Sequence, residues 1–188
     1  MHQTGRIAEE ELIRHCKTGS LKYQELLYMQ FYGYAMGIAL RYSLSRNDAL
    51  EVVNDGFIKI FNSIRNFQSD RPFKAWLRTI IVNTAIDRRR KELKYQVNID
   101  INDLIVISTR ARAIENLDAQ DILELMKQLP PLQLTIFNLY EVDGYNHDEI
   151  AQLLSIPASS SRVYLSRAKE KMRTLLNTET NNHGRAVR

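Results

Sequence analysis

The sequence predicts an all-α protein in which an extended linker joins two small helical domains. Apolar residues return at three- and four-residue steps along most of the 188-residue chain, which is the period of amphipathic helices. Glycine and proline are too sparse in the first half for an all-β fold. Because one long stretch interrupts the helical period, we expect domains at residues 10–94 and 117–177, a linker at 95–116, and a disordered polar tail at 178–188.

The first domain is expected to be a bundle of three or four helices. Helical periodicity begins at residues 21–40, and Ser45 with Asp48 resembles the capping box of a second helix. Pro72 suits the first turn of a third helix that runs to about Leu93. The apolar stripe expected for the second helix comprises Leu50, Val53, Phe57, Ile60, Phe61 and Ile64.

The linker shows a different period. Val97, Ile99 and Ile101 alternate with polar residues as in a strand, but no second strand is predicted nearby to pair with them. We therefore expect an extended segment. Its apolar side chains would lie either in a groove of another molecule or against this protein's own helices.

The second domain has the element order of a helix-turn-helix. Helical periods occupy 118–129 and 132–142, and a last helix is expected to end near Leu176. Before that last helix, Asn146 and Glu149 form a capping-box pattern for a short helix through Leu154.

Two apolar residues suit the close crossing of this short helix and the last helix. Ala151 is small enough for the next helix to pass closely, and Ile156 can fill the turn. Any two helices joined by a turn can share these features. The pattern alone is therefore also compatible with an ordinary helix pair that does not bind DNA.

The helix after this turn carries groups that can bind DNA in the major groove. Serine hydroxyls and backbone N–H groups at a helix start can bind phosphate, and arginine can donate to phosphate or to guanine edges. Inward contacts are expected from Val163, Leu165, Ala168 and Met172. The candidate DNA contacts are Ser159, Ser160, Ser161, Arg162, Tyr164, Arg167 and Lys169.

Charge is unevenly distributed along the chain. The formal net charge is only +4, but residues 71–94 hold eight Lys and Arg against two acids, and residues 162–173 hold five against one. Between them, residues 115–149 hold eight acids against Lys127. This pattern favours a nucleic-acid partner, although ordinary solvated helix faces produce similar runs.

Composition excludes several classes of protein. Hydrophobic residues at 44% and charged residues at 26% are typical of a globular chain, and no apolar run approaches the ~18–20 residues of a membrane span. We expect a cytoplasmic protein without membrane insertion. Cys16 is the sole cysteine, and phosphate loops, zinc-protease motifs and nucleophile elbows are missing, so we expect no enzyme, metal, cofactor or small-molecule substrate.

Two segments of the first domain resemble region two of the bacterial extracytoplasmic-function sigma factors. Residues 48–61, DALEVVNDGFIKIF, are similar to that family's acidic "DAEDLVQETF"-type helix, and residues 73–90, FKAWLRTIIVNTAIDRRR, to its "FxxWLxxIAxNxxxDxxR"-type helix. The second domain resembles region four, with Ile150-Ala151 and Arg167-Ala168 at the "EIA" and "RA" signatures. The resemblance runs from about Lys22 to Leu176.

The resemblance implies that region two binds the β′ clamp of core RNA polymerase. Leu50 stands where the family usually has an acid, and Asn54 replaces the usual Gln. The acids of this segment also favour a helix N-terminus by ~0.3–1 kcal/mol each, which is the alternative explanation. The residues expected to contact polymerase are Asp48, Glu51, Asn54, Asp55 and Phe57.

The resemblance further implies that region two opens the minus-ten promoter element and captures a flipped base, which must regain stacking and hydrogen bonds. For the run Arg88–Lys91 the alternative is favourable placement of cations near a helix C-terminus, and Phe73 and Trp76 are expected in the core. The residues expected to contact minus-ten DNA are Phe67, Gln68, Ser69, Asp70, Arg71, Asn83, Asp87, Arg88, Arg89 and Arg90.

Region four, by the same resemblance, reads the minus-35 element and lies near the β flap. The family's "GTVKSRLSRA" pattern becomes SSSRVYLSRA at 159–168, so the base preference of relatives cannot be transferred. The implied partners are core RNA polymerase, promoter DNA and an anti-sigma factor. The alternative is a free-standing helix-turn-helix regulator that binds duplex DNA as a dimer and never joins polymerase.

Overall fold

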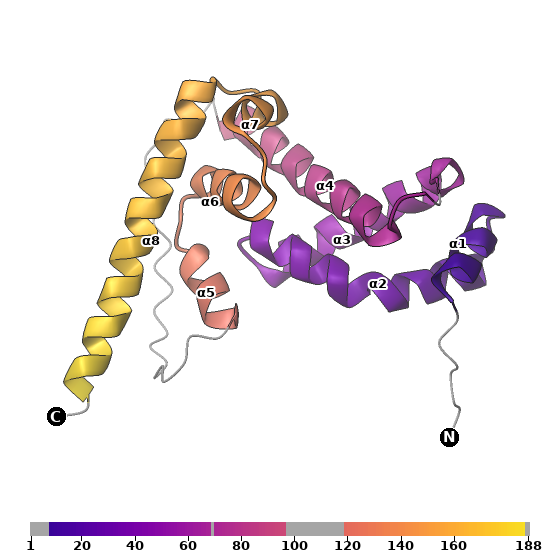
Figure 1. The fold of residues 1–188 in the computed structure, drawn as a ribbon, viewed down its shortest axis with the longest axis horizontal. Coiled ribbons are helices and arrows are strands. Elements are labelled where there is room, and N and C mark those ends of the chain that lie inside the picture. The colour runs from indigo at the N-terminus through magenta and orange to yellow at the C-terminus, as the bar shows by residue number, and fades with distance from the viewer. Residues whose placement is uncertain (1–7, 69, 97–118, 187–188) are drawn as a thin grey trace. The chain divides into compact units, whose positions relative to one another are not determined.

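The computed structural model describes residues 8–68, 70–96 and 119–186, all of whose regular elements are helices (Figure 1). The predicted all-α class is confirmed. The chain divides into two compact units, one of Met1–Leu40 with Ser45–Ala85 and the other of Arg41–Leu44 with Ile86–Arg188. Among the described helices, none combines the length and apolarity that crossing a membrane requires.

The first unit is built from α1 (Glu9–Lys17), α2 (Leu21–Tyr42), α3 (Arg46–Ser63), a 3₁₀ turn at Ile64–Asn66 and the first half of α4 (Phe73–Gln96). These helices bury an apolar centre to which each contributes. Its large, fully buried side chains include Leu12, Leu27, Phe31, Phe57, Ile60, Phe73, Leu77 and Ile81.

The starts of α3 and α4 follow the predicted signals. The Ser45 hydroxyl accepts the Asp48 N–H at 3.1 Å, so Ser45 is the N-cap and the helix begins at Arg46. The Pro72 carbonyl accepts the N–H groups of Ala75 and Trp76 at the beginning of α4. A proline at the start of a helix costs no hydrogen bond, because an N–H at its position would have no partner inside the helix.

One position of the expected α3 stripe was wrong. The buried face consists of residues 49, 52, 53, 56, 57 and 60, and Leu50 lies outside it with its side chain exposed. Successive residues are separated by about 100° around a helix axis, so Leu50, the neighbour of Ala49, lies at the edge of a face that is centred on Ala49 and Ile60.

The second unit contains α5 (Ala119–Met126), α6 (Pro131–Phe137), a π-helical turn at Asn138–Val142, α7 (His147–Leu154) and α8 (Ala158–Ala186). The single helix expected at 132–142 therefore changes its winding at Asn138. The buried side chains that join α5 and α6 to α8 are Leu125, Met126, Leu129, Leu134, Ala168 and Met172.

Two expectations about irregular segments had different outcomes. The linker predicted at 95–116 lies outside the described residues, apart from Tyr95 and Gln96, which end α4. The tail expected to be disordered at 178–188 is instead helical as far as Ala186. No proline follows Pro157, and extending an existing helix costs far less than nucleating one.

Candidate polymerase and nucleic-acid interfaces

The helix-turn-helix is fixed at its start by a complete capping box. The Asn146 side chain accepts the N–H groups of Asp148 and Glu149 at 2.9 Å, and Glu149 accepts the Asn146 N–H at 2.7 Å. These bonds satisfy N–H groups that the first helical turn leaves without partners, which is why α7 begins sharply at His147. The predicted capping box is confirmed.

The turn between α7 and α8 is closed by backbone hydrogen bonds. Ser155 adopts a left-handed conformation, with φ of 56°, and the Ile156 N–H donates to the Ala151 carbonyl at 3.1 Å. The left-handed residue reverses the chain after Leu154, so α8 can begin at Ala158.

The buried face of α8 differs at one position from the expected one. Leu165, Ala168 and Met172 are buried as predicted, but Val163 is 48% exposed and Ser161 is 0% exposed. Ser161 stands four residues before Leu165, so it continues the 4-3-4 spacing of this face, whereas Val163 lies on the opposite side. The prediction of an inward Val163 was wrong, and Ser161 takes its place.

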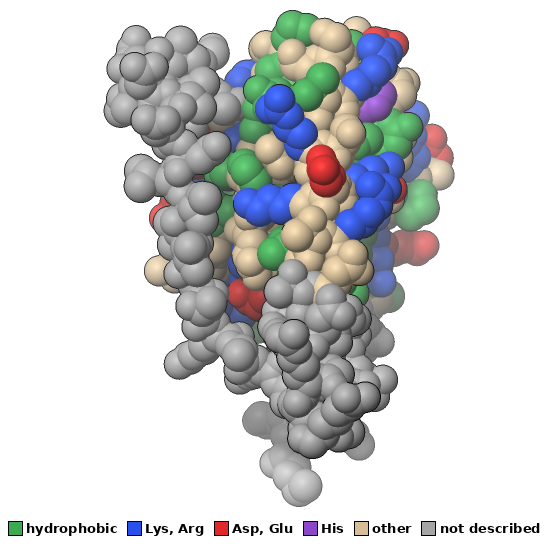
Figure 2. Space-filling model, turned by 90° about the vertical axis from the view of Figure 1, so that its left-hand side faces the viewer, with side chains coloured by type: hydrophobic (Ala, Val, Ile, Leu, Met, Phe, Trp, Pro, Cys, Tyr) green, Lys and Arg blue, Asp and Glu red, His purple; other side chains and the backbone are tan. Residues whose placement is uncertain are grey.

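The outer face of α8 presents Ser159, Arg162 and Arg167 to solvent, with Ser160 and Tyr164 half-buried. Figure 2 looks onto this helix and shows Lys and Arg side chains distributed along it. Lys169 is held differently from the two arginines, because its ammonium lies 2.7 Å from Glu141 and 5.7 Å from the centre of the Tyr140 ring.

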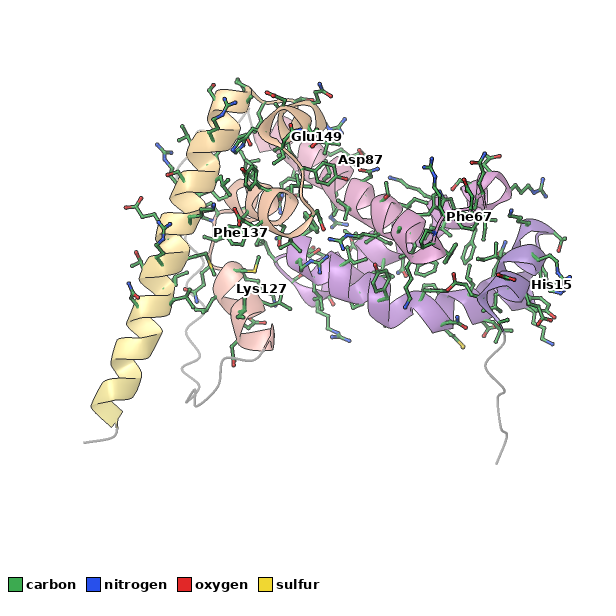
Figure 3. All side chains as sticks on the ribbon, viewed as in Figure 1. His15, Phe67, Asp87, Lys127, Phe137 and Glu149 are labelled. Carbon is green, nitrogen blue, oxygen red and sulfur yellow. The ribbon has the colours of Figure 1, made fainter. Side chains whose placement is uncertain are left out.

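The loop before α4 is anchored by Phe67. Its ring is 5% exposed and packs 5.4 Å from Phe73 and 5.1 Å from Trp76, measured between ring centres (Figure 3). The Lys17 ammonium of α1 also donates to the Phe67 carbonyl at 2.7 Å. Phe67 therefore fixes the base of the loop, while Gln68, Asp70 and Arg71 are exposed. Ser69 lies outside the described residues.

Phe73 and Trp76 have the expected core environment. Phe73 is fully buried and makes an edge-to-face contact with Phe31 at 5.0 Å. Trp76 is half-buried and belongs to the same ring cluster.

The basic run of α4 is partly neutralised within the helix. Arg89 contacts Glu92 at 2.5 Å, Arg88 contacts the same carboxylate at 3.6 Å, and Arg90 lies 3.4 Å from Asp87. These ion pairs at three- and four-residue spacing leave less free charge for DNA than the sequence alone indicates. Asn83, one turn before Asp87, is exposed.

The loop and Asn83 do not form one compact pocket. Asn83 follows Phe73 by ten residues, which places it about 15 Å farther along the axis of α4. The two sets of predicted minus-ten contacts are therefore separated along the helix, with the loop at its start, Asn83 near its middle, and Asp87 and the arginines in its second half.

The predicted polymerase contacts on α3 divide into exposed and buried groups. Glu51, Asn54 and Asp55 are exposed, whereas Phe57 is buried with its ring 4.7 Å from that of Tyr28. The Tyr28 hydroxyl donates to the Asn54 side chain at 3.1 Å. Burial, and secondarily the charge of Tyr32, raises the pKa of Tyr28, so this hydroxyl stays protonated as a donor.

Sequence reasoning missed an apolar contribution to this surface. Ile58 is 58% exposed, and with Leu50 and Asn54 it forms a four-residue spacing along the outer side of α3. That spacing was present in the sequence, but Leu50 was attributed to the buried face. The exposed surface of α3 thus combines two aliphatic side chains with carboxylates.

Comparison with known proteins identifies both regions. Residues 27–94 match the family Sigma-70 region 2, and residues 119–172 match Sigma-70, region 4. The predicted site residues all fall within these two ranges. The chain therefore belongs to the sigma-70 family, within its extracytoplasmic-function group, and the resemblance drawn from its motifs is confirmed.

Individual relatives extend over most of the chain. The ECF RNA polymerase sigma-E factor of Haemophilus influenzae is 26% identical over 177 residues, covering 88% of this chain and 93% of the relative. The RNA polymerase sigma-H factor of Pseudomonas aeruginosa is 24% identical, covering 86% and 90%. The sigma factor SigV of Bacillus subtilis is 28% identical, covering 76% and 84%.

Two solved structures were also matched. CnrH in complex with the cytosolic domain of CnrY gives a TM-score of 0.47 at 19% identity, covering 90% of this chain and 97% of that one. The sigma factor RpoE in complex with the anti-sigma factor NepR from Bartonella quintana gives 0.48 at 20% identity, covering 81% and 96%.

Proposed function

We propose that this protein is an alternative sigma factor that binds core RNA polymerase and directs promoter-specific initiation of transcription. The observation that carries this conclusion is the presence of sigma-70 regions 2 and 4 in one chain and in that order. As a specificity subunit it performs no catalysis of its own, and it acts in the cytoplasm, where polymerase transcribes. Membership of this family favours an anti-sigma factor as its regulator.

The domain boundaries 10–94 and 117–177 assign one task to each half, with residues 95–116 as the spacer. The first domain binds polymerase and opens the minus-ten element. The second reads the minus-35 element, and the charge pattern supports this division because each contains a basic helix.

The exposed side of α3 is the proposed contact with the β′ clamp. Glu51 and Asp55 offer carboxylates to basic groups, and Asp48 lies one turn earlier with its carboxylate bonded to the Ser45 hydroxyl. Leu50 and Ile58 add apolar area, which gives affinity that charges alone seldom provide across an interface. Phe57 acts from beneath by supporting Tyr28.

Minus-ten DNA is proposed to contact the loop and the outer side of α4. Exposed Gln68 and Asp70 can hydrogen-bond the edge of an unstacked base, while Arg71 can bind the adjacent phosphate. Asn83 lies farther along α4, where it would contact the same DNA strand. Arg88, Arg89 and Arg90 would contact phosphate by exchanging their intrahelical carboxylates for DNA.

Minus-35 DNA is proposed to contact the first turns of α8. Ser159 and Ser160 are placed with the helix N-terminus, where backbone N–H groups attract phosphate. Arg162 and Arg167 project from the exposed side and can read guanine edges. Tyr164 and Lys169 flank them.

Binding to core polymerase is the experiment that separates this function from its alternative. Purified protein mixed with core enzyme should co-elute in gel filtration and convert core into an enzyme that forms open complexes. A free-standing regulator would elute separately and would bind duplex DNA by itself. Absence of co-elution would contradict the proposed function.

The site assignments are tested with charge reversal on α3 and with alanine substitution in the loop. Glu51→Lys with Asp55→Lys should weaken core binding at least tenfold, whereas Glu10→Lys on α1 serves as the matched control. Asp70→Ala or Asn83→Ala should impair open-complex formation and leave core binding intact. Loss of core binding by these two variants would show that the minus-ten site is misplaced.

A further inference from the structure

A polar contact joins the two helices of the helix-turn-helix. The Nδ1 atom of His147, at the start of α7, lies 3.0 Å from the hydroxyl of Ser161, in the first turns of α8. Ser161 is fully buried on the inward face of α8, where its neighbours Leu165 and Ala168 are apolar. A hydroxyl at such a position is stable only while hydrogen-bonded, because a buried polar group without a partner is costly.

The ring of His147 is itself held in place. Tyr140, in the π-helical turn, stacks on it with ring centres 4.7 Å apart and an interplanar angle of 28°. The same turn also contacts α8 directly, because Lys169 pairs with Glu141 and lies over the Tyr140 ring. The two points on α8, Ser161 and Lys169, are eight residues or about 12 Å apart.

We propose that His147 is a positioning residue for promoter recognition, which through Ser161 sets the rotation and starting point of α8. Arg162 follows Ser161 directly, so the rotation of α8 about Ser161 decides where this guanidinium meets the groove. A recognition contact must be held within about 0.5 Å to discriminate bases. The inference rests on the proposed function, in which α8 reads minus-35 DNA.

The contact does not depend on the protonation state of the imidazole. A serine hydroxyl can donate to an unprotonated Nδ1 or accept from a protonated one. The bond therefore persists in either tautomer, and the stacked Tyr140 supplies the ring orientation.

Three substitutions separate the hydrogen bond from the stacking. His147→Phe keeps a ring for Tyr140 and removes Nδ1, whereas His147→Asn keeps a polar atom near the Nδ1 position and removes the ring. Ser161→Ala deletes only the hydroxyl and is the mildest change, since alanine is favourable in a helix. Thr174→Ala, an exposed hydroxyl residue of the same helix beyond the proposed DNA contacts, is the matched control.

Each variant is assayed as holoenzyme with core polymerase on a promoter whose start site has been mapped. The measured quantity is the ratio of initiation from the natural minus-35 element to initiation from a scrambled one. Ser161→Ala and His147→Phe should each lower this ratio by about fivefold, and their combination should lower it no further than either alone. His147→Asn should retain most of the ratio, and Thr174→Ala all of it.

The outcomes distinguish this inference from the proposed function. If wild-type holoenzyme initiates but Ser161→Ala and His147→Phe discriminate as well as wild type, the positioning role is wrong and the sigma function stands. An equal loss of initiation from both promoters, with a lowered melting temperature of the variant, would show that the contact only stabilises the fold. That result would likewise overturn the inference. If wild-type protein does not support initiation, the proposed function fails first.

Discussion

Ser155 ends α7 in a conformation that L-amino acids rarely adopt. Its φ of 56° and ψ of 45° lie in the left-handed region, and it is the non-glycine residue with positive φ among those described. Its N–H still donates to the Ala151 carbonyl, and this hydrogen bond at the helix end offsets part of the backbone strain. Glycine is the usual residue at this position because it has no Cβ.

We expect Ser155→Gly to raise the free energy of unfolding by about 0.5–1 kcal/mol, since it relieves this strain without removing a backbone bond. Ser155→Val should lower it, because a β-branched side chain tolerates the left-handed region least. Urea titration followed by circular dichroism measures both. Equal free energies of unfolding for the wild type and both variants would show that Ser155 is not strained.

Cys16 is a buried thiol. It is 2% exposed within α1, and burial raises its pKa from 9.0 to about 11. The folded protein buries the neutral thiol and disfavours the thiolate. The contribution of Cys16 to the free energy of unfolding is therefore complete below pH 9 and is lost as pH rises towards 11.

Alkylation of Cys16 by iodoacetamide at pH 8 should therefore be about 100-fold slower in the native protein than in urea, from the fraction of thiolate alone. Mass spectrometry of timed samples gives both rates. Equal rates would show that α1 does not bury the thiol.

For single residues, the sequence did not reliably indicate which side chains of a helix face inward. Ser161 and Phe67 were assigned to DNA by their place in a motif, yet both side chains are buried. A serine on an inward face is a minority choice, and only the position of His147 across the turn explains it. Such a pairing depends on how two helices cross, which the pattern of either helix does not contain.

The packing of α3 on α4 depends on a glycine. A Cβ at Gly56 would overlap the side chain of Ile81, which is fully buried and has little room to move. Glycines 33 and 37 of α2 have no such neighbour. The same residue type thus allows close approach in one helix and merely lowers helix propensity in another.

Gly56→Ala should lower the free energy of unfolding by about 1 kcal/mol, because overpacking costs more than the gain in helix propensity. Gly37→Ala, the matched control, should raise it by up to about 1 kcal/mol. Thermal unfolding of the two variants measures the difference. A stabilising Gly56→Ala would mean that Ile81 can move aside.

The exposed side of α8 is predicted to bind phosphate and bases through Arg162 and Arg167. Each alanine substitution should weaken minus-35 binding by the holoenzyme and reduce the slope of log K against log salt by about one. Lys127→Ala, whose ammonium pairs with Glu124 outside α8, is the control. An unchanged slope for both arginine variants would exclude phosphate contact.

Helix starts were predictable because their signals are local. Ser45, Pro72 and Asn146 each act through hydrogen bonds within one turn of the residue itself. The π-helical turn at Asn138–Val142 was not predictable, since the apolar period continues through it. The end of α8 was misjudged because a polar composition was taken as disorder.

At the scale of the whole chain, the family membership was readable from two motifs in the right order. The roles of individual residues were less accessible. Intrahelical ion pairs engage part of the basic run on α4, and the exposed surface of α3 includes Ile58, which no charge pattern reveals. The small net charge of +4 hides two basic helices that the proposed function directs to DNA.

Mapping transcript starts on genomic DNA with purified core polymerase, with and without this protein, tests the central claim most directly. We predict a new set of starts that appears only with the protein, and whose upstream DNA shares one sequence near minus-ten and another near minus-35. Unchanged starts, or starts that share no such pair of sequences, would contradict the assignment of a promoter-specific sigma factor.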